Sequence, residues 1–266
     1  MKQISILGCG WLGMPLAKHL LQNGYSIKGS TTTETKLELL QNEGILPFLI
    51  SLQANDISQE IVDFLENSEI LIINIPPGLR GSSSESFVAK MENFIPFIEK
   101  SSVKKVIFVS STSVYADENQ IVTEETVPNP ETESGKQLLT VENLLLQNTN
   151  FQTTILRFGG LIGEDRHPIT FLAGKNNLEN PEAPINLIHQ IDCIEIIHKI
   201  IEKEVWNTVF NAVTPFHLSR KKYYTEKALE LNLVPPQFIE NQFSVGKTVS
   251  SNKLITILNY EFKKLG

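Results

Sequence analysis

The stretch ISILGCGWLGMPLAKHLLQNG, residues 4–24, decides the fold. Ile4–Leu7 is a short apolar run that is typical of a buried strand, and Met14–Asn23 is predicted to be a helix. Between them Gly8, Gly10 and Gly13 follow the pattern G-x-G-x-x-G. A strand, a glycine loop and a helix in this order are the signature of a dinucleotide-binding βα unit.

Each glycine of the loop has a separate physical role in that prediction. Gly8 permits the tight turn, Gly10 lets the backbone approach a pyrophosphate, and Gly13 lets helix and strand pack closely. Unpaired N–H groups at the helix start then face the phosphates. We expect Trp11 and Leu12, within the same loop, to contribute to the cofactor site. The alternative is an ordinary strand-to-helix turn without a ligand.

Strand-like and helix-like patterns alternate through residue 158, which predicts parallel pairing through βαβ crossovers and a doubly wound α/β sheet of Rossmann type, with helices on both faces. The expected strands are Ile4–Leu7, Tyr25–Gly29, Ile45–Ser51, 69–78, 104–111 and 151–158, and the expected helices are Met14–Asn23, Thr33–Gln41, Ile57–Glu66, Ser84–Lys100 and Ser134–Gln147.

The alternation loosens after about residue 160. The pattern there predicts helices at Asp192–Glu202, Ser219–Leu231 and Ser250–Leu258, and a strand at Val209–Val213. We therefore expect an NAD(P)-binding Rossmann domain over residues 1–165. A small C-terminal substrate lobe over residues 166–266 would pack on it as one globular unit.

The end of the second strand bears on the choice of cofactor. An NAD-preferring site usually has Asp or Glu there, to hold the ribose 2′-hydroxyl. This chain has Ser30, Thr31 and Thr32, which offer hydroxyl groups and no negative charge. A 2′-phosphate is therefore tolerated, with Lys28 or Lys36 as candidate cations, and NADP is favoured over NAD.

Composition excludes several classes of protein. The formal net charge of −7 argues against a nucleic-acid partner, whose phosphates require a basic face. The two cysteines lack metal-ligand spacing and the five histidines are dispersed, so no metal site is expected. No apolar run approaches the roughly 18 residues needed to span a bilayer. We expect no membrane partner, a cytoplasmic location and a small-molecule substrate, and we leave the oligomeric state open.

Segments along nearly the whole chain carry a family resemblance: VIFVSSTSVYADENQIVTEETVPNP (106–130), LRFGGLIGEDR (156–166), INLIHQIDCIEIIHKII (185–201) and VFNAV (209–213). They resemble the extended short-chain dehydrogenase/reductase family, which includes nucleotide-sugar epimerases and dehydratases. Leu7 replaces a glycine of the family's usual loop, which is closer to atypical members described as nucleoside-diphosphate-sugar epimerases. The resemblance implies a dinucleotide cofactor and a substrate such as a nucleotide-sugar.

The chain departs from this family at its catalytic helix. The family has Y-G-x-x-K-x-x-x-E, and aligning Gly135 and Glu142 with it places Ser134 at the tyrosine and Leu138 at the lysine. In the family the phenol exchanges a proton with the substrate, and the lysine lowers its pKa and binds the nicotinamide ribose. A serine hydroxyl is far too weak an acid for that role without an assisting base. Lys136 is no easy substitute, because it points to another face of the helix.

Other candidates lie near the expected nicotinamide position. Ser111 matches the family's active-site Ser/Thr at a strand end, and Tyr115 is either a spare acid/base group or a packed loop aromatic. Glu133 and His189 are weaker candidates, better read as a solvated carboxylate and a core histidine. We expect further cofactor contacts from strand-end positions, namely Ile75, Pro76, Pro77, Ser110 and Phe158.

These observations leave two functions open. The first is an NAD(P)-dependent oxidoreductase or epimerase-like enzyme that acts on a sugar-nucleotide or a small carbonyl or hydroxyl compound. The intact scaffold and Ser111 favour it. The second is a dinucleotide-binding sensor or scaffold protein without turnover, which the loss of the tyrosine–lysine pair favours. The sequence does not name the substrate.

Overall fold

The computed structural model describes residues 1–78 and 85–263. Its backbone contacts divide the chain into two compact units. The first, here called the sheet unit, contains Met1–Val114, Pro130–Arg157 and Ile194–Val209. The second, here called the lobe unit, contains Tyr115–Asn129, Phe158–Cys193 and Phe210–Gly266. The expected functional boundary between residues 165 and 166 falls inside the lobe unit and stays a prediction.

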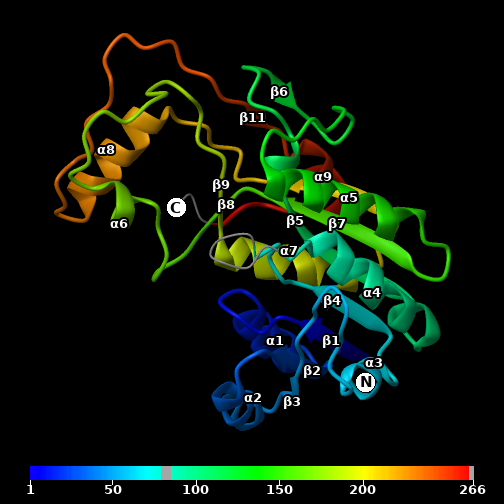
Figure 1. Cartoon of the computed structure of the whole chain (residues 1–266). Helices are drawn as coiled ribbons and strands as arrows, with labels where there is room; N and C mark the ends of the chain where they lie inside the picture. Colours follow the sequence, from blue (N-terminus) through cyan, green and yellow to red (C-terminus); the bar gives the residue numbers. More distant parts are fainter. Residues whose placement is uncertain (79–84, 264–266) are drawn as a thin grey trace. The chain divides into compact units, whose positions relative to one another are not determined.

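Among the described residues, seven strands form a sheet in the order β10-β7-β5-β4-β1-β2-β3 (Figure 1). The bounds of these strands are β1 Gln3–Leu7, β2 Ser26–Thr31, β3 Leu46–Leu49, β4 Ile70–Ile73, β5 Lys105–Ser111, β7 Gln152–Phe158 and β10 Thr208–Ala212. The pairs β1–β2, β1–β4, β2–β3 and β4–β5 are parallel. This confirms the predicted Rossmann-type sheet.

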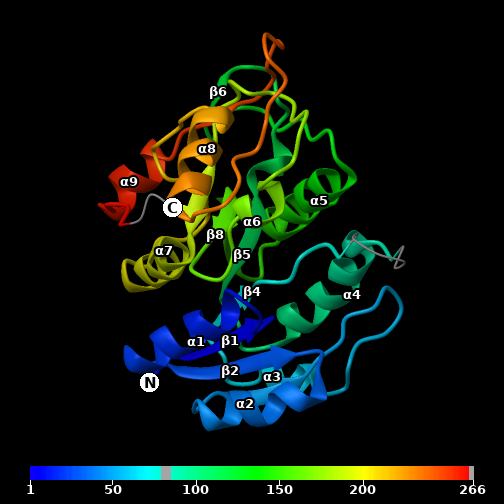
Figure 2. The ribbon, with the colours of Figure 1, turned by 90° about the vertical axis from the view of Figure 1, so that its left-hand side faces the viewer.

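The helices of the chain follow the crossover pattern (Figures 1 and 2). Those associated with the sheet are α1 Gly13–Gln22, α2 Leu37–Asn42, α3 Ile61–Leu65, α4 Phe87–Lys100, α5 Glu133–Gln147 and α7 Gln190–Glu202, with short 3-10 turns η1 Glu34–Lys36 and η2 Thr112–Val114. The elements of the lobe unit are β6 Ile121–Val122, β8 Gly160–Ile162, α6 Ile169–Leu172, β9 Leu187–His189, α8 Arg220–Glu230, β11 Thr248–Val249 and α9 Asn252–Leu258.

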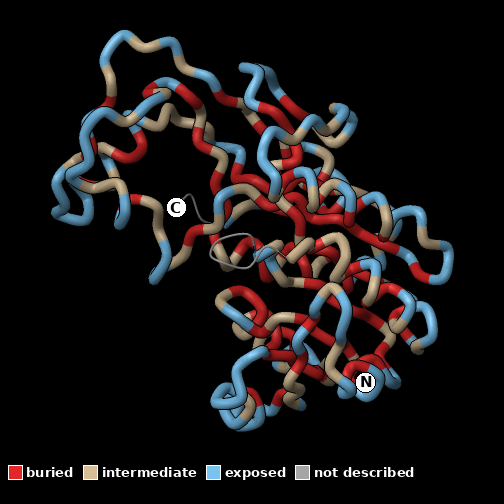
Figure 3. Tube along the Cα trace, in the orientation of Figure 1, coloured by how far each residue is buried: buried red, intermediate tan, exposed pale blue. Residues whose placement is uncertain are grey.

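The core of the sheet unit follows from its strand sequences. All four residues of β4, Ile70 to Ile73, have no exposed surface. A continuous apolar run of this kind is expected where both faces of a parallel sheet are covered by helices. In Figure 3 the segment of the tube that corresponds to β4 is coloured as buried. Ser86 and Thr132 cap the starts of α4 and α5 by accepting the backbone N–H of Ala89 and Gly135.

Several element boundaries differ from those predicted. The second strand extends to Thr31, so Ser30 and Thr31 lie within β2. The helix predicted at Ile57–Glu66 is reduced to α3, Ile61–Leu65. The predicted start of the fourth helix at Ser84 lies outside the described residues. The pattern also missed β6, β8, β9, β11 and α6, because elements of two to four residues are too short to show a periodicity.

Candidate functional site: a pocket at the glycine loop

The glycine loop joins β1 to α1, and two of its glycines are required by the protein's own atoms. Gly8 has φ +102°, and a Cβ there would lie 2.6 Å from the carbonyl oxygen of Asn74. A Cβ on Gly13 would lie 2.1 Å from the carbonyl oxygen of Gly8. Both contacts are far below van der Waals distance, so no larger residue fits without rearrangement. Gly13 thus lets the first turn of α1 pack directly against the loop, as its position in the motif predicts.

Gly10 has a different environment. A Cβ placed on it would meet no protein atom within 4 Å, so the protein itself does not require a glycine there. The open space lies at the start of α1, where the residue before the helix is Leu12. Leucine has no side-chain oxygen, so no side chain caps the first N–H groups of this helix as Ser86 and Thr132 do for α4 and α5. An anion is the usual partner for such groups.

Side chains from the two strands beside β1 hold the Gly8 peptide. The N–H of Gly8 donates to Ser30 Oγ at 2.9 Å, and Asn74 Nδ2 donates to the carbonyl oxygen of Gly8 at 3.0 Å. The backbone N–H of Cys9 also donates to the Ser30 carbonyl oxygen at 2.8 Å. Ser30 was expected at the cofactor ribose, and in the structure its hydroxyl also binds the loop. Asn74 was missed by sequence reasoning, although it directly follows an apolar strand.

A pocket of about 390 Å³ opens beside this loop, entirely within the sheet unit. It collects residues from the carboxyl ends of β1, β2, β3 and β4, the edge where open α/β sheets bind ligands. Its lining residues are Leu7, Gly8, Cys9, Gly10, Ser30, Thr31, Thr32, Thr33, Lys36, Ile50, Ser51, Leu52, Asn74, Ile75, Pro76, Pro77, Gly78, Phe87 and Lys90.

The pocket brings together part of the predicted cofactor set. Gly8, Gly10, Ser30, Thr31, Thr32, Ile75, Pro76 and Pro77 all line it. Leu12 and Gly13 are buried behind the loop, and Trp11 is half-buried beside them. Ser110 and Phe158 do not line this pocket, nor do the candidate catalytic residues Ser111, Tyr115 and Ser134.

The charge on the pocket wall is positive. Among the described residues that line the pocket there is no aspartate or glutamate, whereas Lys36 and Lys90 both line it. Lys90 Nζ forms an ion pair with Glu85 at 2.8 Å, and the hydrogen bond from Lys90 is the main cause that lowers the pKa of that carboxyl group. Within the described part of the chain, Lys36 forms no ion pair. An anionic ligand therefore meets favourable charge on a protein whose net charge is −7.

Lys28 does not assist this site. Its ammonium donates to the backbone carbonyl oxygens of Asp63 and Glu66, each at 2.6 Å. The residue is 8 % exposed, and burial lowers its pKa. The expectation that Lys28 could serve a cofactor phosphate is therefore wrong, and of the two lysines expected from the sequence only Lys36 lines the pocket. Burial raises the pKa of the Cys9 thiol to about 12, which favours its protonated form at neutral pH.

Ser134, at the start of α5, stands where the family resemblance expects a tyrosine. A Cβ on Gly135 would lie 2.4 Å from the carbonyl oxygen of Ser113, so the first turn of α5 packs against η2. This contact brings Ser134, which is half-buried, close in space to the segment that follows Ser111. Ser111 Oγ accepts the N–H of Ser113 at 3.1 Å, so its own proton remains available.

Further along α5, the side chains on the same face of the helix as Ser134 are buried. Leu138 is 4 % exposed, and Glu142, one turn further, is fully buried. The Glu142 carboxylate accepts from Arg157 Nε at 3.1 Å and Nη2 at 2.6 Å, and from Ser110 Oγ at 2.5 Å. Ser110 is expected from the sequence to contact the cofactor, and that contact stays a prediction; in the structure its hydroxyl donates to this buried carboxylate.

Tyr115 lies in the lobe unit, and its phenol hydroxyl is hydrogen-bonded within the protein. It is 2 % exposed, and its hydroxyl donates to the carbonyl oxygen of Thr123 at 3.0 Å. The side-chain amide of Asn211 lies 3.0 Å from the same phenol oxygen. Asn211 Nδ2 is buried and has no partner among the described residues, and turning the amide would let it donate to the phenol. These contacts favour a structural role for Tyr115 over an acid/base role.

The remaining candidates lie elsewhere. Glu133 is exposed and accepts from Gln137 Nε2 at 2.8 Å. His189 is 8 % exposed, and its Nδ1 accepts the N–H of Ile191. Across residues 1–78 and 85–263, no three His, Cys, Asp or Glu side chains gather as a metal site. None of the described helices combines the length and apolar character required to cross a membrane.

A family described as NAD(P)H-binding matches residues 8–187, which include every residue given above as lining the pocket except Leu7. The chain belongs to this NAD(P)H-binding family. Protein YeeZ of Escherichia coli strain K12 is 32 % identical over 265 residues, which cover 99 % of this chain and 96 % of YeeZ.

Solved structures support the fold independently. The UDP-glucuronic acid 4-epimerase from Bacillus cereus, solved in complex with NAD, has a TM-score of 0.82 at 18 % identity, covering 98 % of this chain and 92 % of that chain. MoeE5, solved in complex with UDP-glucose and NAD, has a TM-score of 0.81 at 18 % identity, covering 98 % and 94 %. At this identity the likeness concerns the fold alone, and the family assignment rests on the NAD(P)H-binding match.

Proposed function

We propose that this chain is an NADP(H)-dependent oxidoreductase or epimerase-like enzyme whose substrate is a nucleotide-sugar or a small carbonyl or hydroxyl compound. The observation that carries the cofactor part is the pocket itself: a glycine loop with open space at Gly10, and a wall whose described residues include two lysines and no carboxylate. The substrate part rests on the UDP-sugars named for structurally similar proteins and on the family resemblance.

The residues present fit a dinucleotide. The loop at Gly8 and Gly10 and the uncapped start of α1 would hold the pyrophosphate, and Thr31, Thr32 and Lys36 would surround the 2′ position of the adenosine ribose. Apolar residues at the other wall, including Ile50, Leu52 and Phe87, suit a planar base. When bound, the nicotinamide would supply or accept a hydride.

The chain's own residues must then bind the substrate and move a proton. Ser134 and Ser111 are hydroxyl groups on adjoining segments that can hydrogen-bond a substrate oxygen. Neither is acidic enough to exchange a proton alone, and Leu138 supplies no charge to assist. The proposed enzyme therefore requires another proton donor, or a substrate whose oxygen is already activated.

The alternative is a dinucleotide-binding sensor or scaffold protein without turnover. The observation in its favour is the buried Leu138 at the position of the family's lysine. Measuring NADPH oxidation against a panel of keto-sugars and UDP-sugars discriminates the two functions. Tight NADPH binding without turnover across the panel, in a folded sample, would support the sensor and refute the enzyme.

The cofactor preference is tested by calorimetric titration with NADPH and NADH. Lys36→Gln removes the cation proposed for the 2′-phosphate and should weaken NADPH binding by roughly tenfold, or about 1.4 kcal/mol, while NADH binding stays unchanged. Thr31→Asp should shift the preference towards NADH, because a carboxylate repels the 2′-phosphate and accepts from a 2′-hydroxyl.

Lys18→Gln is the matched control for these titrations. Lys18 is another lysine with an exposed side chain, on α1, where it pairs with Glu43 at 2.8 Å outside the pocket lining. The Lys18→Gln variant removes the same charge from the protein without changing the proposed site, so neither the NADPH affinity nor the NADH affinity should change. A clear NADH preference of the parent, or an equal loss of both cofactors in Lys36→Gln, would contradict the assignment of NADP.

A further inference from the structure

The lobe unit holds a histidine–tyrosine pair that the glycine-loop pocket does not use. His167, just before α6, has its Nε2 2.9 Å from the phenol oxygen of Tyr223 on α8. His167 Nδ1 is 3.1 Å from the backbone N–H of Ile169, from which it accepts a hydrogen bond. A neutral imidazole carries one N–H. Because Nδ1 accepts, Nε2 must carry the proton, and it therefore donates to the Tyr223 oxygen.

His167 is held in this neutral form by its surroundings. Burial lowers its pKa to about 4, with a smaller contribution from the charge of Lys227. Above about pH 5 the imidazole of His167 is therefore uncharged, so Nε2–H donates and Nδ1 accepts across the neutral range. The pair thus has one fixed direction of hydrogen bonding, from histidine to tyrosine.

This direction leaves the phenol proton of Tyr223 unused. The phenol oxygen accepts from His167, and no described residue accepts the Tyr223 O–H in return. Tyr223 is only 6 % exposed. Buried tyrosine hydroxyls normally find a partner, because an unmade hydrogen bond in a dry site costs free energy. The structure therefore presents a buried, oriented donor that lacks its acceptor.

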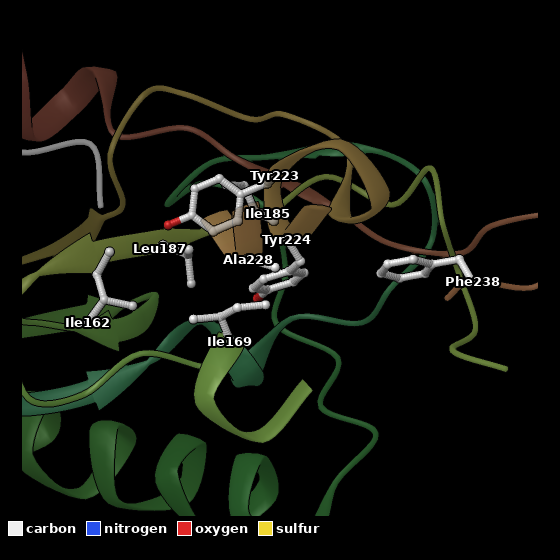
Figure 4. Close-up of a cluster of buried hydrophobic side chains, with 8 residues drawn as sticks. All are labelled: Ile162, Ile169, Ile185, Leu187, Tyr223, Tyr224, Ala228 and Phe238. Carbon is white, nitrogen blue, oxygen red and sulfur yellow. The ribbon is translucent and has the colours of Figure 1, made fainter. Parts of the chain in front are cut away.

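The surroundings define which acceptor would suit it. Tyr223 belongs to a cluster of buried side chains in the lobe unit, shown in Figure 4, that also contains Ile162, Ile169, Ile185, Leu187, Tyr224, Ala228 and Phe238. Such a setting strengthens a hydrogen bond and keeps the phenol protonated, since burial raises the pKa of Tyr223.

The charges nearby are already paired. Lys227 Nζ is 2.9 Å from Glu230, and Arg220 donates to the carbonyl oxygen of Glu179 while its guanidinium lies over the Phe238 ring. An anionic group would therefore find no unpaired cation among these residues. A neutral oxygen beside an apolar or planar group fits both the donor and its surroundings.

We infer that Tyr223, oriented by His167, is a substrate-binding donor of the lobe unit that takes a neutral carbonyl or hydroxyl oxygen of the substrate. This inference rests on the proposed function for the existence of such a substrate, and the pair itself rests on geometry alone. It also supplies a tyrosine hydroxyl in a chain that lacks the family's tyrosine at Ser134.

The binding test compares two adjacent tyrosines. Tyr223→Phe removes the donor, and Tyr224→Phe is the matched control, since Tyr224 is 7 % exposed in the same cluster on the same helix. Each variant is saturated with NADPH and titrated with UDP-glucose, dihydroxyacetone and inorganic phosphate. We expect Tyr223→Phe to weaken binding of a neutral-oxygen probe at least tenfold. Tyr224→Phe should change it less than twofold, and NADPH binding should not change in either variant.

Three results would overturn the inference while leaving the cofactor assignment intact. One is equal probe affinity in Tyr223→Phe and the parent, as expected if a water occupies the donor. Another is a parent that binds NADPH but neither UDP-glucose nor dihydroxyacetone. The third is a phosphate affinity that depends on Tyr223, which would indicate an anion site.

A ligand-free measurement judges the pair separately. Nitrogen-15 NMR of the imidazole should show His167 as the neutral, Nε2-protonated tautomer from about pH 6 to 8. An Nδ1-protonated or charged His167 would refute the donor assignment even if the parent bound no cofactor at all. Failure of NADPH binding with the expected tautomer would instead count against the proposed function alone.

Discussion

Replacement of Gly10 tests whether this glycine is required for cofactor binding or for folding stability. A Cβ at this position meets no protein atom within 4 Å, and Gly10 does not have the positive φ that would strain an L-residue. Gly10→Ala should therefore fold normally. Its free energy of unfolding should be unchanged or higher by up to about 1 kcal/mol, because the unfolded chain loses conformational freedom.

Cofactor affinity should respond in the opposite direction. If the open space at Gly10 is where the pyrophosphate approaches the backbone, a side chain there displaces it from the N–H groups at the start of α1. A hydrogen bond to a charged group contributes about 1.5–3 kcal/mol, so losing one weakens NADPH binding about 10- to 150-fold. Gly10→Val, with a larger and branched side chain, should lose at least as much.

Gly13→Ala is the contrasting variant in the same loop. Its Cβ would lie 2.1 Å from the Gly8 carbonyl oxygen, so this variant should lose about 1–3 kcal/mol of stability before any ligand is added. Urea unfolding gives the stability of each variant, and quenching of tryptophan fluorescence by NADPH gives its affinity. A Gly10→Val protein that binds NADPH as tightly as the parent, or one that unfolds like Gly13→Ala, would refute the loop assignment.

Two other changes test the helix α5. Arg157→Met should destabilise the protein by about 3–5 kcal/mol, because it leaves the buried Glu142 carboxylate without its ion-pair partner. Urea unfolding measures this loss, and the double variant Glu142→Gln with Arg157→Met should recover part of it. A loss below about 1 kcal/mol in Arg157→Met would contradict the pairing. Leu138→Lys should cost about 3 kcal/mol or more in the free protein, because the ammonium is buried without a partner, and NADPH should raise its melting temperature more than that of the parent. Combined with Ser134→Tyr it should raise turnover of a generic carbonyl substrate by up to about 10²–10⁴-fold, and equal stabilisation of Leu138→Lys and the parent by NADPH would refute the alignment.

The sequence predicted what depends on local pattern. The βα unit at residues 4–24 and the parallel sheet were both predicted, because strand and helix periodicities and glycine spacing are encoded within a few residues. The hydrophobic run at β4 and the glycines at positions 8 and 13 have roles that can be read without knowing their neighbours.

The partners of individual polar side chains could not be predicted in this way. Ser30 and Asn74 meet the Gly8 peptide from 22 and 66 residues away in the chain. Lys28 was assigned by its nearness to the strand end, yet its ammonium lies against the carbonyl groups at the end of α3. Tyr115 is 96 residues from Asn211. Each of these contacts depends on how the whole chain folds.

The two side chains that hold Gly8 have a consequence for how cofactor affinity and folding are connected. Fixing the backbone of one residue costs about 1–2 kcal/mol of conformational entropy. Ser30 from β2 and Asn74 after β4 bind this peptide in the free protein, so the entropy of ordering it is lost on folding. It therefore does not reduce the free energy of cofactor binding. The Gly8 amide should accordingly exchange slowly with solvent deuterium before any cofactor is added. Loosening either flanking strand, even at its far end, should then raise the dissociation constant of the dinucleotide without altering any residue that touches it.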